Sequence, residues 1–99
     1  MRINISCKHM ELTAPIEEYI RRKAEKLSRF YDRIQQVDVI LATIPNGYAV
    51  EILTDVERHE DFIANCESPD LYACIDGAVD REIRQLSDHK ERTKNHHPH

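Results

Sequence analysis

The stretch VDVILATIPNGYAVEILTDV, residues 37–56, predicts the centre of the fold. Its first part, Val37 to Ile44, is strongly apolar and rich in β-branched residues, which is typical of a strand with little exposure. Pro45-Asn46-Gly47 then supplies the residues of a tight turn. From Tyr48 to Val56 apolar and polar residues alternate, which indicates a second strand with one buried face. The stretch therefore predicts a β-hairpin whose second strand turns Tyr48, Val50, Ile52 and Val56 inward.

Further strands are predicted on either side of this hairpin. Residues 2–7 alternate between polar and apolar side chains, so they are expected to form a half-buried strand. Residues 62–66 carry apolar side chains at every second position and follow a charged loop at 57–61. They predict a strand that pairs after the hairpin.

Helices are predicted in the two remaining segments. Thr13 is placed as an N-cap with Pro15 in the first turn, and this helix is expected to run to about Arg33. Ser68-Pro69-Asp70 combines a cap, a proline and an acid, which predicts a second helix that ends at about Lys90. The apolar residues that this second helix is expected to bury are Leu71, Ile75, Ala78, Val79 and Leu86.

The order of elements is β-α-β-β-β-α, which predicts an α+β fold with a four-stranded sheet and two helices packed on one face. One domain is expected over residues 1–94, followed by a disordered, His-rich tail at 95–99. The uncovered sheet face is expected to meet solvent through Asn4, Ser6, Glu51, Asp55 and Asn65.

Composition excludes several classes of protein. The chain has 99 residues, of which 40% are hydrophobic and 32% charged, and no stretch approaches the roughly 20 apolar residues of a membrane span. Its first residues lack the apolar core of a signal peptide. The three cysteines have no CxxC spacing and are expected to be free thiols in a reducing compartment. A cytoplasmic location without membrane contact is therefore expected.

Charge is strongly polarised along the chain, although the net charge is −4. Of 14 Lys and Arg residues, only Arg2, Lys8 and Arg58 lie outside the segments 21–33 and 81–94. The stretch 45–68 is acidic instead. This pattern argues against nonspecific coating of nucleic acid and favours an anionic groove that both predicted helices reach together.

Four cations in the first predicted helix share one stripe. Arg22, Lys26, Arg29 and Arg33 follow a spacing of four, three and four, which places them within an arc of about 60° on a helix. Like charges in a row repel and do not help folding, so a polyanion is the natural partner. The alternative is a solvated face in which Glu18 and Glu25 are interspersed.

No catalytic, metal or cofactor site is predicted. The six histidines do not form a preorganised cluster, and the chain has only two glycines, so it lacks a Gly-rich phosphate loop. The exposed sheet face also lacks the pair of aromatic residues that stack RNA bases in an RNA-recognition motif. A non-enzymatic protein that recognises the backbone and shape of structured RNA is expected.

Two groups of motifs stand out in the predicted helices. One is the segment from Asp70 to Gly77, continued by Arg84-Gln85-Leu86 and His89-Lys90, and the other is Lys26-Leu27 with Asp32-Arg33-Ile34. They resemble the second and the first helix of bacterial ribosome hibernation promoting factors, and the resemblance extends over nearly the whole length of the chain. The length is similar to the short form of the family. By position the resemblance implies RNA-binding roles for Lys23, Lys26, Arg33, Arg81, Arg84, Gln85 and Lys90, and Arg22 and Arg29 complete the stripe.

The same resemblance implies a fold similar to double-stranded-RNA-binding domains and a site on the small ribosomal subunit and its rRNA. Bound in the channel for messenger and transfer RNA, members inhibit translation in stationary phase or stress, and short forms promote inactive ribosome dimers together with ribosome modulation factor. A monomer is expected when the protein is free. The alternatives are a generic double-stranded-RNA-binding module, or a protein-interaction regulator of transcription that uses the acidic stretch 45–68.

Two residues depart from the family pattern. Asp88 stands where a basic residue is usual and is placed to form an ion pair with Arg84, four residues earlier. Glu82 stands where an apolar residue is usual and points near the packing face of the helix. Either this helix rotates slightly, or Glu82 reaches the edge of the sheet by its aliphatic stem.

Overall fold

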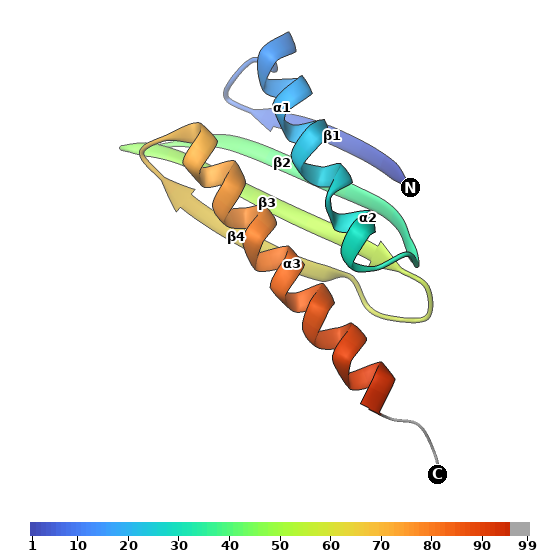
Figure 1. The fold of residues 1–99 in the computed structure, drawn as a ribbon. Helices are drawn as coiled ribbons and strands as arrows, with labels where there is room; N and C mark the ends of the chain where they lie inside the picture. Colours follow the sequence, from blue (N-terminus) through green and yellow to red (C-terminus); the bar gives the residue numbers. More distant parts are fainter. Residues whose placement is uncertain (96–99) are drawn as a thin grey trace.

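In the computed structural model, a four-stranded sheet carries all of the helices on one face (Figure 1). The structure describes residues 1–95. The order β-α-β-β-β-α is confirmed, with the first helical segment divided in two. The elements are β1 (Arg2–Lys8), α1 (Ala14–Glu25), α2 (Leu27–Phe30), β2 (Ile34–Ile44), β3 (Gly47–Val56), β4 (Phe62–Ser68) and α3 (Leu71–Asn95).

The strands lie in the order β1-β2-β3-β4, so the predicted hairpin forms the centre of the sheet. β1 is parallel to β2, whereas the β2–β3 and β3–β4 pairs are antiparallel. The hairpin closes with Ile44 paired to Gly47 and with Asn46 in the left-handed region at φ 69°. A Cβ on Gly47 would lie 2.6 Å from the Ser68 carbonyl oxygen, so the close approach of the turn to the end of β4 requires glycine.

The core lies between the sheet and the helices. The predicted inward residues of the central strands are buried, apart from Tyr48, which is half-buried at the rim of the core. All five apolar residues that the second helix was expected to bury are buried in α3. Gly77 of α3 lies against β4, because a Cβ there would come within 2.7 Å of the Cys66 sulfur. Close packing of α3 on the sheet therefore depends on this glycine.

The first helix ends earlier than its sequence predicted. The Ser28 hydroxyl donates a hydrogen bond of 2.8 Å to the Glu25 carbonyl. The Arg29 amide donates a hydrogen bond of 3.0 Å to the carbonyl of Lys26, three residues earlier. The helix is thus tightened between α1 and α2. It stops at Phe30 because the next residue is extended, and Arg33 lies in the segment that leads into β2. The prediction of one helix to Arg33 was therefore wrong.

The second predicted helix begins where expected and runs further. The Ser68 hydroxyl accepts a hydrogen bond from the Asp70 amide at 3.2 Å, and α3 then continues to Asn95 rather than ending near Lys90. Its last turns project beyond the sheet (Figure 1). Asn95, the first residue of the predicted His-rich tail, is the last residue of α3, and residues 96–99 lie outside the described part of the chain.

Glu82 is fully buried between α3 and the sheet, so its expected position near the packing face is confirmed. The expectation that it reaches the edge of the sheet is wrong, because it accepts a hydrogen bond of 2.7 Å from the hydroxyl of Thr54 on the interior strand β3. Its other carboxyl oxygen has no hydrogen-bond partner among the described residues. Burial raises the pKa of Glu82 to about 7, partly opposed by the Thr54 hydrogen bond. The packed state thus favours the neutral carboxylic acid.

This burial makes stability depend on pH. Because the folded carboxyl binds its proton more tightly than the unfolded one, with an ordinary pKa of 4.5, stability is greatest at low pH and falls as pH rises toward about 7. We expect the wild type to lose about 1–3 kcal/mol between roughly pH 5 and 8 in urea unfolding, and Glu82→Gln to lose much less.

The control for this experiment is Glu91→Gln, which changes an exposed glutamate on the same helix and should keep the wild-type pH profile. A Glu82→Gln protein with the pH dependence of the wild type would show that Glu82 does not control it.

Candidate nucleic-acid interface

The nine predicted RNA-binding residues lie in the helical layer. α1 and α2 supply Arg22, Lys23 and Arg29, with Lys26 at the junction between the two helices, and Arg33 follows them in the connection to β2. Arg81, Arg84, Gln85 and Lys90 are on α3, which packs beside α1 and α2 on the same sheet face (Figure 1). The predicted residues are thus carried by one side of the molecule, but their neighbours differ.

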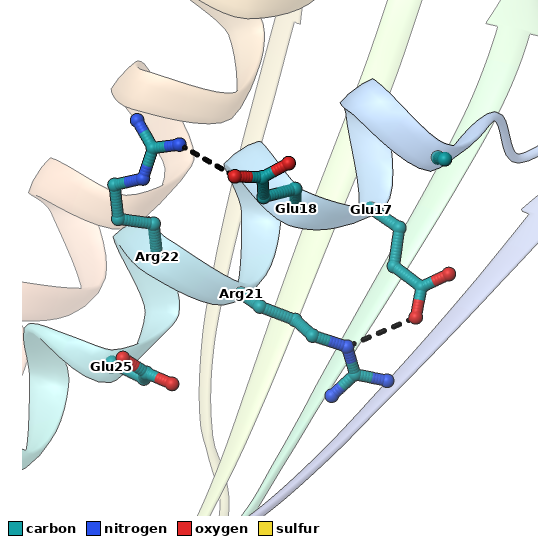
Figure 2. Close-up of a pocket in the computed structure, with 6 residues that line it drawn as sticks. Glu17, Glu18, Arg21, Arg22 and Glu25 are labelled. Carbon is teal, nitrogen blue, oxygen red and sulfur yellow. Dashed lines mark hydrogen bonds and ion pairs between the residues drawn. The ribbon is translucent and has the colours of Figure 1, made fainter.

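Short-range ion pairs partly neutralise α1. Arg21 Nε lies 3.0 Å from Glu17 Oε2, and an Arg22 guanidinium nitrogen lies 3.3 Å from Glu18 Oε1. Both pairs line a shallow hollow that Glu25 also lines (Figure 2). These side chains are largely exposed, so each pair is weak and contributes well under about 1 kcal/mol. Arg22 remains accessible, but its surroundings carry as much negative as positive charge.

Lys23 joins α1 to α3 instead of projecting freely. Its ammonium lies 3.2 Å from the Asp76 carboxylate, which also accepts a 2.6 Å hydrogen bond from the Tyr19 hydroxyl. The hydrogen bond to Asp76 raises the pKa values of both Lys23 and Tyr19. The Tyr19 ring packs edge-on against Tyr72 at 4.8 Å. Lys23 is therefore part of a contact that sets the two helical segments side by side.

Arg81 and Gln85 reach the free edge of the sheet. β4 is an edge strand, and its outward carbonyls have no strand to bond. Gln85 donates to the Ile63 carbonyl at 2.8 Å, and Arg81 donates to the Asn65 carbonyl. These bonds protect the edge from pairing with another strand. Sequence reasoning missed this role, because the neighbour of β4 cannot be known before the strand order is.

Six further cations of the helices and the adjoining segments have no carboxylate partner within the described residues. They are called the six unpaired cations below and are named at the end of this paragraph. Arg84 belongs to this set because the expected ion pair with Asp88 is not formed. Arg92 was not among the predicted residues, although it lies in the basic segment 81–94. The set consists of Lys26, Arg29, Arg33, Arg84, Lys90 and Arg92.

The uncovered face of the three strands β2, β3 and β4 is acidic. On the uncovered side of β2, β3 and β4, the strand register places four carboxylates and, among the described side chains, no cation. The basic residues of this face, Arg2 and Lys8, are on β1. A polyanion is therefore attracted by the helical face and repelled by the centre of the sheet face. The carboxylates are Asp38, Glu51, Asp55 and Glu67.

Other kinds of site find little support among residues 1–95. No group of three His, Cys, Asp or Glu side chains there is placed to hold a metal ion. Burial raises the pKa of the Cys74 thiol to about 11, so it is not a ready thiolate nucleophile. In the same range, no helix has both the length and the apolar character needed to cross a membrane.

The sequence is similar to known proteins along almost its whole length. Residues 3–94 match the family model described as Sigma 54 modulation protein / S30EA ribosomal protein. The ribosome hibernation promoting factor of Escherichia coli strain K12 is 35% identical over 96 residues, which cover 97% of this chain and 100% of that protein. The Pseudomonas putida protein of the same name is 36% identical over 92 residues, covering 93% of this chain and 89% of the relative.

Solved structures share the fold. The N-terminal domain of Protein Y from Thermus thermophilus superposes with a TM-score of 0.81 at 30% identity, covering 90% of this chain and 99% of that one. A ribosomal subunit interface protein from Coxiella burnetii has a TM-score of 0.85 at 20% identity, covering 92% and 99%. At that identity the second match concerns the fold alone.

These findings confirm the resemblance that the helix motifs indicated. The family is one of non-enzymatic ribosome-binding hibernation factors, in agreement with the sequence-based expectation. With a family model matched over residues 3–94 and full-length relatives above 30% identity, the chain belongs to the Sigma 54 modulation protein / S30EA ribosomal protein family, which includes the ribosome hibernation promoting factors.

Proposed function

We propose that this protein is a cytoplasmic ribosome hibernation factor that binds rRNA of the small ribosomal subunit with its helical face. The observation that carries the proposal is the distribution of charge. The six unpaired cations are carried by the helices and the segments directly joined to them, and the uncovered surface of β2, β3 and β4 is acidic. Membership of the family supports the ribosome as the target.

Charge sorting also accounts for binding by a protein whose net charge is −4. An evenly distributed acidic charge would repel rRNA, whereas a basic face gains from releasing counterions when its cations contact phosphates. The acidic sheet surface then points away from the RNA and limits binding in other orientations. The protein should therefore prefer an RNA groove that both helical segments can reach, rather than any exposed duplex.

We propose that the bound protein occupies the channel of messenger and transfer RNA and so inhibits translation during stationary phase or stress. Its body has principal extents of 52 × 23 × 19 Å, and a rigid body of this size would exclude other ligands from a groove by volume. In this proposal, inactive ribosome dimers form with the help of ribosome modulation factor, and the free protein is a monomer. Neither a chemical step nor a cofactor is required.

The acidic sheet surface favours one alternative, a regulator of transcription that binds a protein partner there. Fractionation of cell extracts by sucrose gradient separates the two functions. The hibernation proposal expects the protein in the small-subunit, ribosome and ribosome-dimer fractions of starved cells. Recovery only in fractions without ribosomal particles would favour the alternative, and tight binding to free duplex RNA would favour a generic double-stranded-RNA-binding module.

Binding to purified small subunits should weaken steeply with salt. If each of the six unpaired cations contacts a phosphate, the slope of log affinity against log salt concentration should be roughly −4 to −5. Sedimentation of the protein with small subunits across a potassium chloride series measures this slope. A flat response would remove the argument for phosphate contacts.

Two triple variants separate unpaired from paired cations. We expect Lys26→Gln with Arg29→Gln and Arg33→Gln to abolish most binding and to reduce the magnitude of the salt slope by about 2–3. The matched variant, Arg21→Gln with Arg22→Gln and Lys23→Gln, removes the same charge from side chains that have carboxylate partners and should lose much less affinity. Thermal unfolding checks that both variants fold, and equal losses of affinity would contradict the distinction.

A further inference from the structure

Phe30 is an exposed aromatic residue at the end of α2, with 39% of its surface accessible. The other strongly exposed ring is that of Tyr72, at 41%, which packs edge-on against Tyr19. Within the described part of the chain no ring packs against Phe30 in this way. An apolar ring is thus left partly open to solvent, in a segment that also carries Lys26, Arg29 and Arg33.

The fold holds Phe30 outward because other residues take the inner positions. Leu27, one turn earlier, is fully buried, and Tyr31 turns inward as the chain becomes extended. The Tyr31 amide bonds the Leu27 carbonyl at 3.2 Å, and its hydroxyl lies 3.4 Å from His89 Nε2 on α3. With both neighbours anchored in this way, Phe30 cannot enter the core without displacing one of them.

The residues that hold Tyr31 in place also contact three other parts of the fold. The His89 ring packs edge-on against Tyr31 at 5.4 Å and against His59 at 4.6 Å. His59 in turn stacks on Phe62 of β4 at 4.4 Å and an interplanar angle of 7°. The Arg33 carbonyl accepts a bond of 3.3 Å from the Glu57 amide beyond β3. The backbone that presents Phe30 is thus tied to α3, to β4 and to the loop between β3 and β4.

Three of the unpaired cations are close to Phe30 in the sequence. Lys26 precedes Phe30 by four residues, at the junction between α1 and α2, so about one helical turn separates the two residues. Arg29 is adjacent in sequence, and Arg33 follows in the connection to β2. None of the three has a carboxylate partner among the described residues. An apolar ring set among cations suits a ligand that has both a flat face and negative charge, and a nucleotide has both.

We infer that Phe30 stacks on an unpaired nucleobase of RNA whose flanking phosphates are bound by Lys26, Arg29 and Arg33. This inference rests on the proposed function and adds a contact to its RNA surface. Stacking requires a base that has left its helix, as in an rRNA loop or bulge, so this end of the protein selects single-stranded RNA. This inference differs from the sequence-based expectation that recognition uses the backbone and shape of RNA.

An affinity series with purified small subunits tests the stacking. Phe30→Tyr keeps the ring and should bind within about twofold of the wild type, whereas Phe30→Leu should bind roughly 5- to 100-fold more weakly. Because leucine changes no charge, its salt slope should equal that of the wild type. Arg29→Gln is the comparison, since it should reduce the magnitude of the slope by about 0.7–0.9. Thermal unfolding verifies that each variant is folded.

A fluorescence measurement tests the contact directly. The chain contains no tryptophan, so Phe30→Trp introduces a single reporter, and 5-hydroxytryptophan can be incorporated there to separate its emission from that of ribosomal proteins. Binding of small subunits should quench this emission through base stacking. The same label introduced by Tyr72→Trp, at a similarly exposed position at the start of α3, should be quenched far less.

The outcomes distinguish this inference from the proposed function. If the wild type binds small subunits with the expected salt slope but Phe30→Leu binds equally well, stacking is wrong and the phosphate contacts stand. If Phe30→Trp binds without selective quenching, the ring does not meet a base. If the wild type does not bind small subunits at all, the proposed function fails, and the stacking inference fails with it.

Discussion

The apolar contact between one face of the sheet and its helices is the constraint on which the rest of the molecule depends. This contact buries β-branched strand residues beneath α1, α2 and α3, and it leaves the other sheet face without a cover. Two outer surfaces result, one made by the helices and one by the strands. The uncovered faces of β2, β3 and β4 carry four carboxylates and, among the described residues, no cation. The helical layer carries most of the cations, together with carboxylates of its own, so the covering of one sheet face places an acidic surface opposite these cations. Fold and electrostatic polarity therefore have a single origin.

Within the helical layer, local contacts divide the cations further. Lys23 shares Asp76 with Tyr19 and so holds α1 beside α3, and Arg81 and Gln85 occupy carbonyls of the edge strand. These bonds contribute to the arrangement of elements and leave the side chains less available to a phosphate. The cations near the α1–α2 junction and toward the end of α3 form no ion pair with a carboxylate among the described residues. A surface can thus be basic by sequence although only part of its cations is available to a ligand.

The sequence predicted the fold well because each element has a local signal. Strand alternation, the turn at 45–47 and the start at Ser68-Pro69-Asp70 all reappear in the structure, and so does the burial of Leu86. Long-range contacts could not be predicted in the same way. The sequence placed Glu82 near the packing face but not beside Thr54, which is 28 residues away, and the shortening of the first helix at the Ser28 hydroxyl has no pattern in the sequence. The basic residues were found by spacing, but which of them are paired depends on partners such as Asp76, more than 50 residues from Lys23.

The central claim is that the helical face, and not the sheet face, meets the ribosome. Acetylation of lysines followed by mass spectrometry tests it most directly, with the protein free or bound to purified small subunits. Lys26 and Lys90 lie in the helical layer, whereas Lys8 is exposed at the end of β1 on the sheet side. The account predicts that binding protects Lys26 and Lys90 while Lys8 keeps its reactivity. Protection of Lys8, with Lys26 and Lys90 still reactive, would contradict it.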